Sequence, residues 1–189
     1  RLIDRSEGVP QSSNQSSNQT SKNLLIGSTE PFSGKSATVL GLALQLRSQG
    51  LNVAYSKPIG TCLREGDDEL DEDVRFIAQT LGLSPEHIRP TIFVLDEATI
   101  QKQLSQEQLI SSQSVESALS SGGEDILLIE GPGNLEEGTL FGLSLPDIAE
   151  KSQAAVILVT RYLSALEVDK LLAAKNKLGG QLVGGVITD

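Results

Sequence analysis

The segment GSTEPFSGKS (residues 27–36) has the residue types of a phosphate-binding loop, and it joins an apolar run to an amphipathic stretch. Backbone amides in such a loop lie at the positive end of the following helix, where they can cradle a polyphosphate. Lys35 would neutralise the outer phosphates, and the Ser36 hydroxyl would bind Mg²⁺. The strict pattern has a glycine five residues before Gly34, where this chain has Thr29. The nucleotide-binding residues predicted here are Thr29, Ser33, Gly34, Lys35 and Ser36.

A plain helix start is the alternative interpretation of the same residues. Ser33 would then be the N-cap, and Gly34 would allow close packing. The coincidence of a buried strand, a Gly-Lys-Ser string and a helix favours the phosphate loop. Glu30 stands where partition ATPases carry a second lysine, which argues against that type of NTPase.

A lysine follows the next predicted strand, in YSKPIGT (55–61). Pro58 keeps the residue before it in extended backbone, so Lys57 is expected at the rim of the sheet. A lysine at such a rim can meet an anionic acceptor. A solvated surface lysine is the alternative.

The acidic run EGDDELDED (65–73) has seven acidic residues and no basic one. Most of these carboxylates must face solvent because they repel one another, so a flexible loop is the usual meaning of such a run. Asp73 is the best candidate for a metal ligand, because it opens the amphipathic stretch 74–83.

A carboxylate also ends the buried run in ILLIEGPGN (126–134). Glu130 would be expensive to bury unpaired, and a bound metal or its water would remove that cost. Gly131 and Gly133 would let the backbone pass close to a ligand. A dinucleotide-binding fingerprint is excluded, because Pro132 lies within it and Glu136 replaces its third glycine.

The elements that must position these residues alternate between short apolar runs and longer amphipathic stretches. Strands are predicted at 24–28, 52–56, 91–95, 125–130, 154–160 and 181–188, and helices at 35–49, 71–82, 105–120, 144–152 and 164–178. Several strands are apolar at consecutive positions, which is typical of parallel strands covered on both faces. We therefore predict an α/β fold with a doubly wound, mainly parallel sheet of P-loop NTPase type and helices on both faces. Ligands of such sheets bind at the carboxyl ends of the strands.

The composition fits one acidic globular domain. The 189 residues include 15 Lys and Arg against 25 Asp and Glu, a formal charge of −10, which repels nucleic acid and anionic lipid. No apolar run approaches the ~20 residues of a membrane span. The single cysteine, Cys62, excludes an intrachain disulfide, and the single histidine, His87, excludes a multi-histidine metal site. These features predict a cytoplasmic protein that binds neither nucleic acid nor membrane.

Residues 1–22 are expected to be a disordered tail or linker, because 11–21 consist only of Ser, Asn, Gln and Thr. A native linker and a tag remnant remain equally open. Residues 23–189 form the predicted domain. We expect it to be truncated at its C-terminus, since the chain contains no Met and ends just after the last predicted strand.

Residues 23–189 resemble the dethiobiotin synthetase family and its relatives, including the dethiobiotin-synthetase-like N-terminal domain of phosphotransacetylase-family proteins. The resemblance rests on the order of GSTEPFSGKS, YSKPIGT, the acidic run entering a helix, LLIEGPGN, AAVILVTRY and GGVITD. The segment 133–150 is closer to the phosphotransacetylase-linked relatives than to the synthetases. The resemblance implies three groups of residues: Lys35 and Lys57 for catalysis; Lys57, Thr61, Gly131 and Gly133 for the substrate; and Ser36, Asp73 and Glu130 for the metal.

The implied function is a domain that binds Mg²⁺ and ATP, located at the N-terminus of a phosphotransacetylase-like protein. One alternative is a complete dethiobiotin synthetase, which phosphorylates a carbamate oxygen with Mg-ATP and then closes a ring. Another is a regulatory or interaction module with a degenerate phosphate site. An active form would be an ATP-dependent cyclo-ligase or phosphoryl-transfer enzyme. The expected partners are a nucleotide and a small anionic acceptor, together with a second copy or a downstream domain of the same chain.

Overall fold

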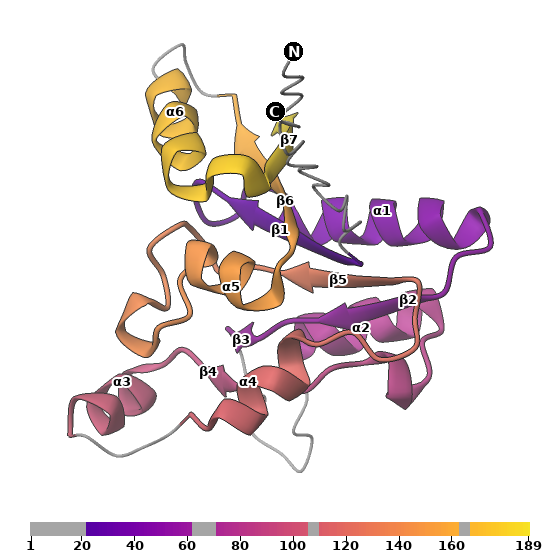
Figure 1. Ribbon diagram of the computed structural model, residues 1–189, viewed down its shortest axis with the longest axis horizontal. Coiled ribbons are helices and arrows are strands. Elements are labelled where there is room, and N and C mark those ends of the chain that lie inside the picture. The colour runs from indigo at the N-terminus through magenta and orange to yellow at the C-terminus, as the bar shows by residue number, and fades with distance from the viewer. Residues whose placement is uncertain (1–21, 62–70, 106–109, 163–166) are drawn as a thin grey trace, which may run out of the picture.

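A five-stranded parallel sheet forms the centre of the molecule (Figure 1). The computed structural model describes residues 22–61, 71–105, 110–162 and 167–189, so nearly all of the predicted tail lies outside the described residues. The strand order is β2-β5-β1-β6-β7, and every neighbouring pair is parallel. The strands are β1 (Asn23–Ser28), β2 (Val53–Ser56), β5 (Ile126–Glu130), β6 (Ala155–Arg161) and β7 (Leu182–Thr188). The predicted α/β class is confirmed.

Helices cover both faces of this sheet, and the strand sequences explain why. In β1, Ile26 packs toward α1 (Lys35–Ser48) and α2 (Glu72–Leu81), while its neighbour Leu25 packs toward the opposite face. That opposite face is covered by α4 (Ser112–Leu119), α5 (Leu145–Ser152) and α6 (Glu167–Leu178). Because successive strand residues point to opposite faces, consecutive apolar residues give two hydrophobic cores, one on each side.

The segment 91–95 does not join the main sheet as a strand. Only β4 (Phe93–Val94) is extended there, and it pairs with β3 (Ile59–Gly60) in a separate two-stranded parallel sheet. Ile92 N–H donates to Pro58 O at 2.8 Å, so this segment pairs with the residues just beyond the end of β2. Its apolar residues are only partly buried, at the margin of one core. The sequence pattern identified an apolar run but not its pairing partner.

The helix predicted at 105–120 is shorter than expected. It begins at Ser112, because Ser111 caps it in a reciprocal pair with Ser114. Residues 106–109 of the predicted helix lie outside the described residues. An unpredicted helix, α3 (Glu97–Leu104), precedes this segment, and the Asp96 side chain caps it by accepting from Thr99 N–H. The remaining short helices are of 3₁₀ type: η1 (Pro85–His87), η2 (Thr139–Phe141) and η3 (Gly179–Gln181).

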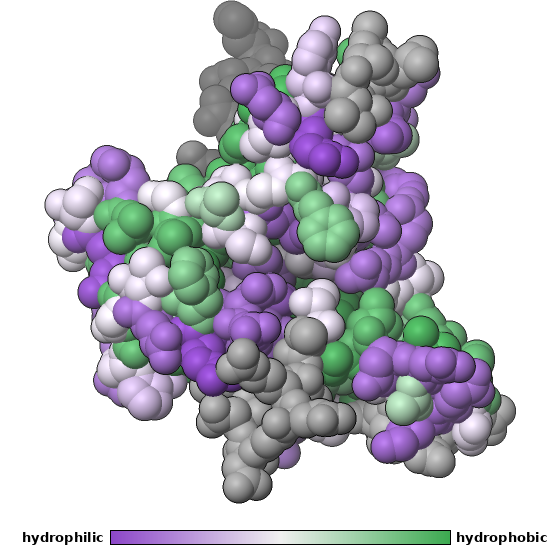
Figure 2. All heavy atoms as spheres, turned by 180° about the vertical axis from the view of Figure 1, so that it is seen from behind, coloured by the Kyte–Doolittle hydropathy of each residue, from purple (hydrophilic) through white to green (hydrophobic). Residues whose placement is uncertain are grey.

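The face seen from behind in Figure 2 mixes side-chain types. Hydrophobic residues form separate patches there, with hydrophilic residues between them. Within the described residues, no helix is both long enough and apolar enough to cross a membrane.

Candidate functional site

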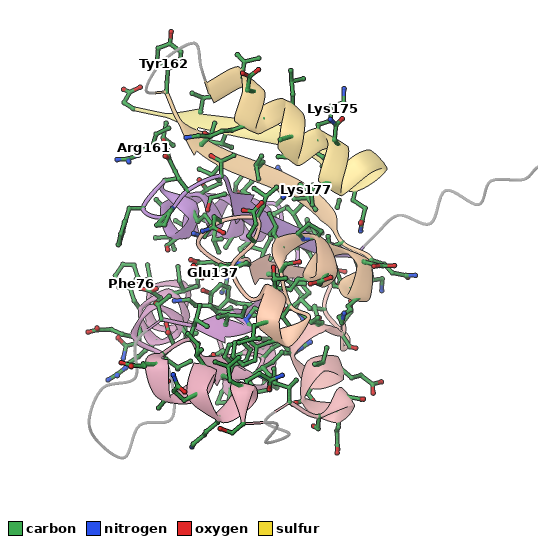
Figure 3. All side chains as sticks on the ribbon, turned by 90° about the vertical axis from the view of Figure 1, so that its left-hand side faces the viewer. Phe76, Glu137, Arg161, Tyr162, Lys175 and Lys177 are labelled. Atoms are coloured by element: carbon green, nitrogen blue, oxygen red, sulfur yellow. The ribbon has the colours of Figure 1, made fainter. Side chains whose placement is uncertain are left out.

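Three loops and the starts of two helices line a cavity of about 550 Å³ at the carboxyl edge of the sheet. The loops follow β1, β2 and β5, and the helices are α1 and α2. These strands are neighbours in a parallel sheet, so their carboxyl ends meet at one edge. In Figure 3 this edge faces the viewer, and Glu137 lies near its centre.

The phosphate loop leads directly into α1, which begins at Lys35. Gly34 has φ 93°, a left-handed conformation that favours glycine. No side chain caps this helix, so the interpretation of Ser33 as N-cap is not what the structure contains. Ser33 is one of the residues that line the cavity, and its hydroxyl is buried and has no hydrogen-bond partner among the described residues.

The first half of the same loop is held against β6 and β7. The Thr29 hydroxyl donates to Thr160 Oγ1 at 2.8 Å, and Glu30 accepts from the Arg161 backbone N–H and Nε at 3.3 and 3.4 Å. The Thr188 hydroxyl donates to Ser33 O at 2.9 Å. Thr29 does not line the cavity, in contrast to the other four residues predicted to bind the nucleotide. Its contact supports the shape of the loop.

Ser36 and Glu130 meet across the cavity floor. The Ser36 hydroxyl donates to Glu130 Oε1 at 2.8 Å, and the Tyr55 hydroxyl donates to Glu130 Oε2 at 2.7 Å. Glu130 and Tyr55 are almost completely buried, with exposed fractions of 3% and 1%. Burial, followed by the nearby charge of Glu130, holds the pKa of Tyr55 well above its usual range. The tyrosine therefore stays protonated and orients the carboxylate.

Lys57 lies opposite, between two carboxylates. Its ammonium group donates to Asp71 Oδ1 at 2.9 Å, to Asp73 Oδ2 at 2.5 Å and to Thr61 Oγ1 at 3.2 Å. Burial alone would lower the pKa of Lys57, but the hydrogen bonds to Asp73 and Asp71 outweigh it and the pKa is raised. The lysine is therefore charged.

The pKa of Lys35 is shifted in the opposite direction from that of Lys57. Burial lowers the pKa of Lys35, although the charges of Glu130 and Glu137 act against this shift. Glu137 Oε1 also accepts from Gly133 N–H at 2.9 Å, which ties the glycine turn after β5 to the segment that follows it. Around Lys35 and Lys57 the cavity thus contains more carboxylates than ammonium groups.

Most of the residues predicted from sequence come together here. Those lining the cavity are Ser33, Gly34, Lys35, Ser36, Lys57, Thr61, Asp73, Glu130, Gly131 and Gly133. The sequence analysis missed Tyr55, Asp71 and Glu137. Tyr55 and Asp71 each lie two residues before a predicted site residue, and this spacing was the only signal that could have found them.

The hydroxyl and carboxylate oxygens that line the cavity could supply some, but not all, of the ligands of a hard cation. Hydroxyl and carboxylate oxygens are the ligands that Mg²⁺ prefers, and it usually keeps several waters and binds phosphates as well. Among the described residues, no cluster of three or more His, Cys, Asp or Glu side chains is arranged to hold a metal ion by itself. A metal here would need the Ser36 hydroxyl and phosphate oxygens in addition to Glu130 and Asp73.

Comparisons with known proteins point to one family. A model of the family described as AAA domain matches residues 22–188. The chain is 31% identical over 172 residues to the ATP-dependent dethiobiotin synthetase BioD of Mycobacterium avium (strain 104), a match covering 85% of this chain and 74% of that protein. It is also 31% identical over 142 residues to the enzyme of the same name from Mycolicibacterium gilvum (strain PYR-GCK), covering 72% of this chain and 60% of the relative.

A solved structure shares the fold. The signal recognition particle receptor FtsY from Elizabethkingia anophelis, in complex with GDP, aligns with a TM-score of 0.57 at 16% identity, over 93% of this chain and 51% of that one. The chain thus spans about half of the FtsY chain. Together with the parallel sheet, this match shows a P-loop NTPase-like α/β fold.

Proposed function

The chain belongs to the AAA domain family, and on that premise we propose that it binds a magnesium–ATP complex in the cavity at the carboxyl edge of the sheet. The observation that carries the proposal is the hydrogen bond of 2.8 Å between Ser36 Oγ and Glu130 Oε1. It places a hydroxyl of the phosphate loop, which follows β1, beside the carboxylate that ends β5, and a metal held by both side chains would require this proximity.

Two further features support a ligand of this kind. The buried Ser33 hydroxyl lacks a partner among the described residues, and an unpaired buried polar group is unfavourable unless a ligand or water pairs with it. The excess of carboxylates over lysines would repel a bare polyphosphate, but it suits one whose charge is reduced by a cation.

For the reaction, we propose chemistry of dethiobiotin synthetase type, with Lys57 and Thr61 facing a small anionic acceptor. A carbamate oxygen of the acceptor would attack the γ-phosphorus of ATP as the bond to ADP breaks. A neighbouring amine would then attack the carbamate carbon, and phosphate would leave as the ring closes. The metal would neutralise phosphate charge when bound. The protein's part is to position the reactants and supply the charges of Lys35 and Lys57.

The wider context is also a proposal. The GNLEEGTLFGLSLPDIAE segment (133–150) favours the N-terminal domain of a cytoplasmic phosphotransacetylase-like protein. The identity to the mycobacterial enzymes favours a dethiobiotin synthetase instead. Assay of the full-length protein for ATP-dependent ring closure separates the two.

The proposed binding is tested by calorimetric titration with Mg-ATP. Lys35→Ala removes a point charge from the phosphate site, and losing a hydrogen bond to a charged group costs about 1.5–3 kcal/mol, or roughly a 10- to 150-fold weaker affinity. Lys175→Ala, on the exposed side of α6, is the matched control and should bind like the wild type. Equal affinity of Lys35→Ala and wild type for Mg-ATP, with unchanged circular dichroism, would mean that the loop only begins α1 and does not bind phosphate.

A further inference from the structure

The ammonium group of Lys57 has no hydrogen-bonding capacity left. An ammonium has three N–H donors, and here Thr61 Oγ1, Asp71 Oδ1 and Asp73 Oδ2 accept one each. Only 4% of the side chain is exposed, which leaves little room for a fourth partner. A lysine in this state cannot also bind an anionic acceptor. One of its three partners must leave first.

The two carboxylates differ in how firmly they are held. Asp71 is 1% exposed, caps α2, and accepts from Thr61 N–H at 2.8 Å and Asp73 N–H at 3.0 Å as well as from the lysine. Asp73 is 49% exposed and lines the cavity together with Ser36 and Glu130. Asp73 is therefore the partner that can exchange, while Asp71 holds the lysine in place.

We propose that Asp73 is shared between Lys57 and the metal–nucleotide complex, so that binding of the metal turns this carboxylate away from Lys57 and frees one of its N–H groups for the oxyanion of the acceptor. The inference rests on the proposed function, because it needs a metal in the cavity. Asp71 is then a positioning residue, which keeps Lys57 at the cavity wall before and after the exchange.

The consequence is a coupling between two ligands. Each ligand strengthens the binding of the other. The metal takes Asp73 away from Lys57, which frees the lysine for the acceptor, and an acceptor bound to Lys57 leaves Asp73 free for the metal. Such coupling is reciprocal: if the metal strengthens the binding of the acceptor, the acceptor strengthens the binding of the metal by the same factor. In the absence of metal, Lys57 stays paired with Asp73, and the acceptor binds more weakly by that factor.

A mutant cycle on metal affinity tests the shared carboxylate. The free Mn²⁺ signal in electron paramagnetic resonance reports Mn²⁺ binding to the protein with a non-hydrolysable ATP analogue. Lys57→Met should tighten Mn²⁺ binding by about fivefold or more, the lower end of typical coupling between sites, because Asp73 loses its competing partner. In the Asp73→Asn background the same substitution should change nothing. Equal tightening in both backgrounds would show a general charge effect and overturn the proposal.

Removing Lys57 leaves the buried Asp71 without its positive partner, which can unfold a protein. The cycle is therefore repeated in the Asp71→Asn background, where asparagine retains the capping ability of Asp71. The comparison of Lys57→Met with and without Asp73→Asn must give the same pattern there. A Lys57→Met effect that does not depend on Asp73 in this background contradicts the proposal as well.

Acetate serves as the probe for the acceptor's oxyanion. Saturating acetate should tighten Mn²⁺ binding to the wild type with the ATP analogue, and should have no effect in Lys57→Met. No effect on the wild type overturns the release of Lys57. Failure of the wild type to bind Mn²⁺ with the analogue at all is a different result, which overturns the proposed function itself.

Discussion

Tyr55→Phe removes the buried hydroxyl that supports Glu130 from behind the cavity, and should destabilise the protein measurably. The hydroxyl donates to Glu130 Oε2 at 2.7 Å, and the tyrosine side chain is 1% exposed. Phenylalanine keeps the ring, so packing in the core with Ile26 and Leu128 is preserved. The lost contact is a hydrogen bond to a charged group, which is worth about 1.5–3 kcal/mol.

Urea unfolding followed by circular dichroism measures this change. With a slope of about 1–3 kcal/mol per molar urea, the midpoint should fall by roughly 1 M while the slope stays constant. Tyr162→Phe is a matched control, because this second tyrosine is 67% exposed, and it should leave the midpoint unchanged. An unchanged midpoint for Tyr55→Phe would refute the reasoning, since it would mean that Glu130 does not depend on the tyrosine.

Two more predictions concern positions outside the cavity. Burial alone would raise the pKa of Glu124, but hydrogen bonds from backbone N–H groups and from Arg89 outweigh it, and the pKa is lowered. The ion pair of Arg89 and Glu124 should therefore stabilise the fold above the unfolded pKa of about 4.3, and this stabilisation should be lost as the pH falls through the lower folded pKa. The gap in unfolding free energy between wild type and Glu124→Gln should therefore shrink in acid, and a constant gap would contradict it. Gly27→Ala should destabilise by about 1–3 kcal/mol, because the new Cβ would lie 2.3 Å from Leu145 Cδ2. Gly41→Ala, in an open position of α1, should stabilise by about 0.8–1 kcal/mol in the same urea unfolding experiment, and equal effects at the two glycines would contradict the packing argument.

The sequence was sufficient to predict the parallel sheet and the residues at its carboxyl edge. Glu130 ends a buried run, Lys57 directly follows one, and Lys35 lies at the end of the loop that follows a third. Parallel pairing brings the carboxyl ends of these runs, and the loops that leave them, to one edge of the sheet. The pairing of 91–95 could not be predicted, because an apolar run does not specify its partner strand.

For the supporting side chains, the sequence offered only the two-residue spacing before Lys57 and Asp73, which does not show a contact by itself. Asp71 is one of seven acidic residues in the run 65–73, and nothing else in the sequence distinguishes it from the others. Its burial against Lys57 is seen only in the folded structure. Tyr55 looked like an ordinary strand residue until the register of β2 and β5 placed its hydroxyl beside Glu130. Roles that depend on contacts between distant segments leave no periodic pattern in the chain.

The central claim is that a metal–nucleotide complex binds between the phosphate loop and the end of β5. A crystal structure of the protein with Mn²⁺ and a non-hydrolysable ATP analogue tests it most directly, because the anomalous signal locates the metal without reference to any model of the site. We predict one Mn²⁺ peak beside Ser36 Oγ, within reach of the carboxylates of Glu130 and Asp73, with the phosphates along residues 33–36. A metal and nucleotide bound elsewhere, or a cavity that stays empty at saturating ligand, would contradict the account.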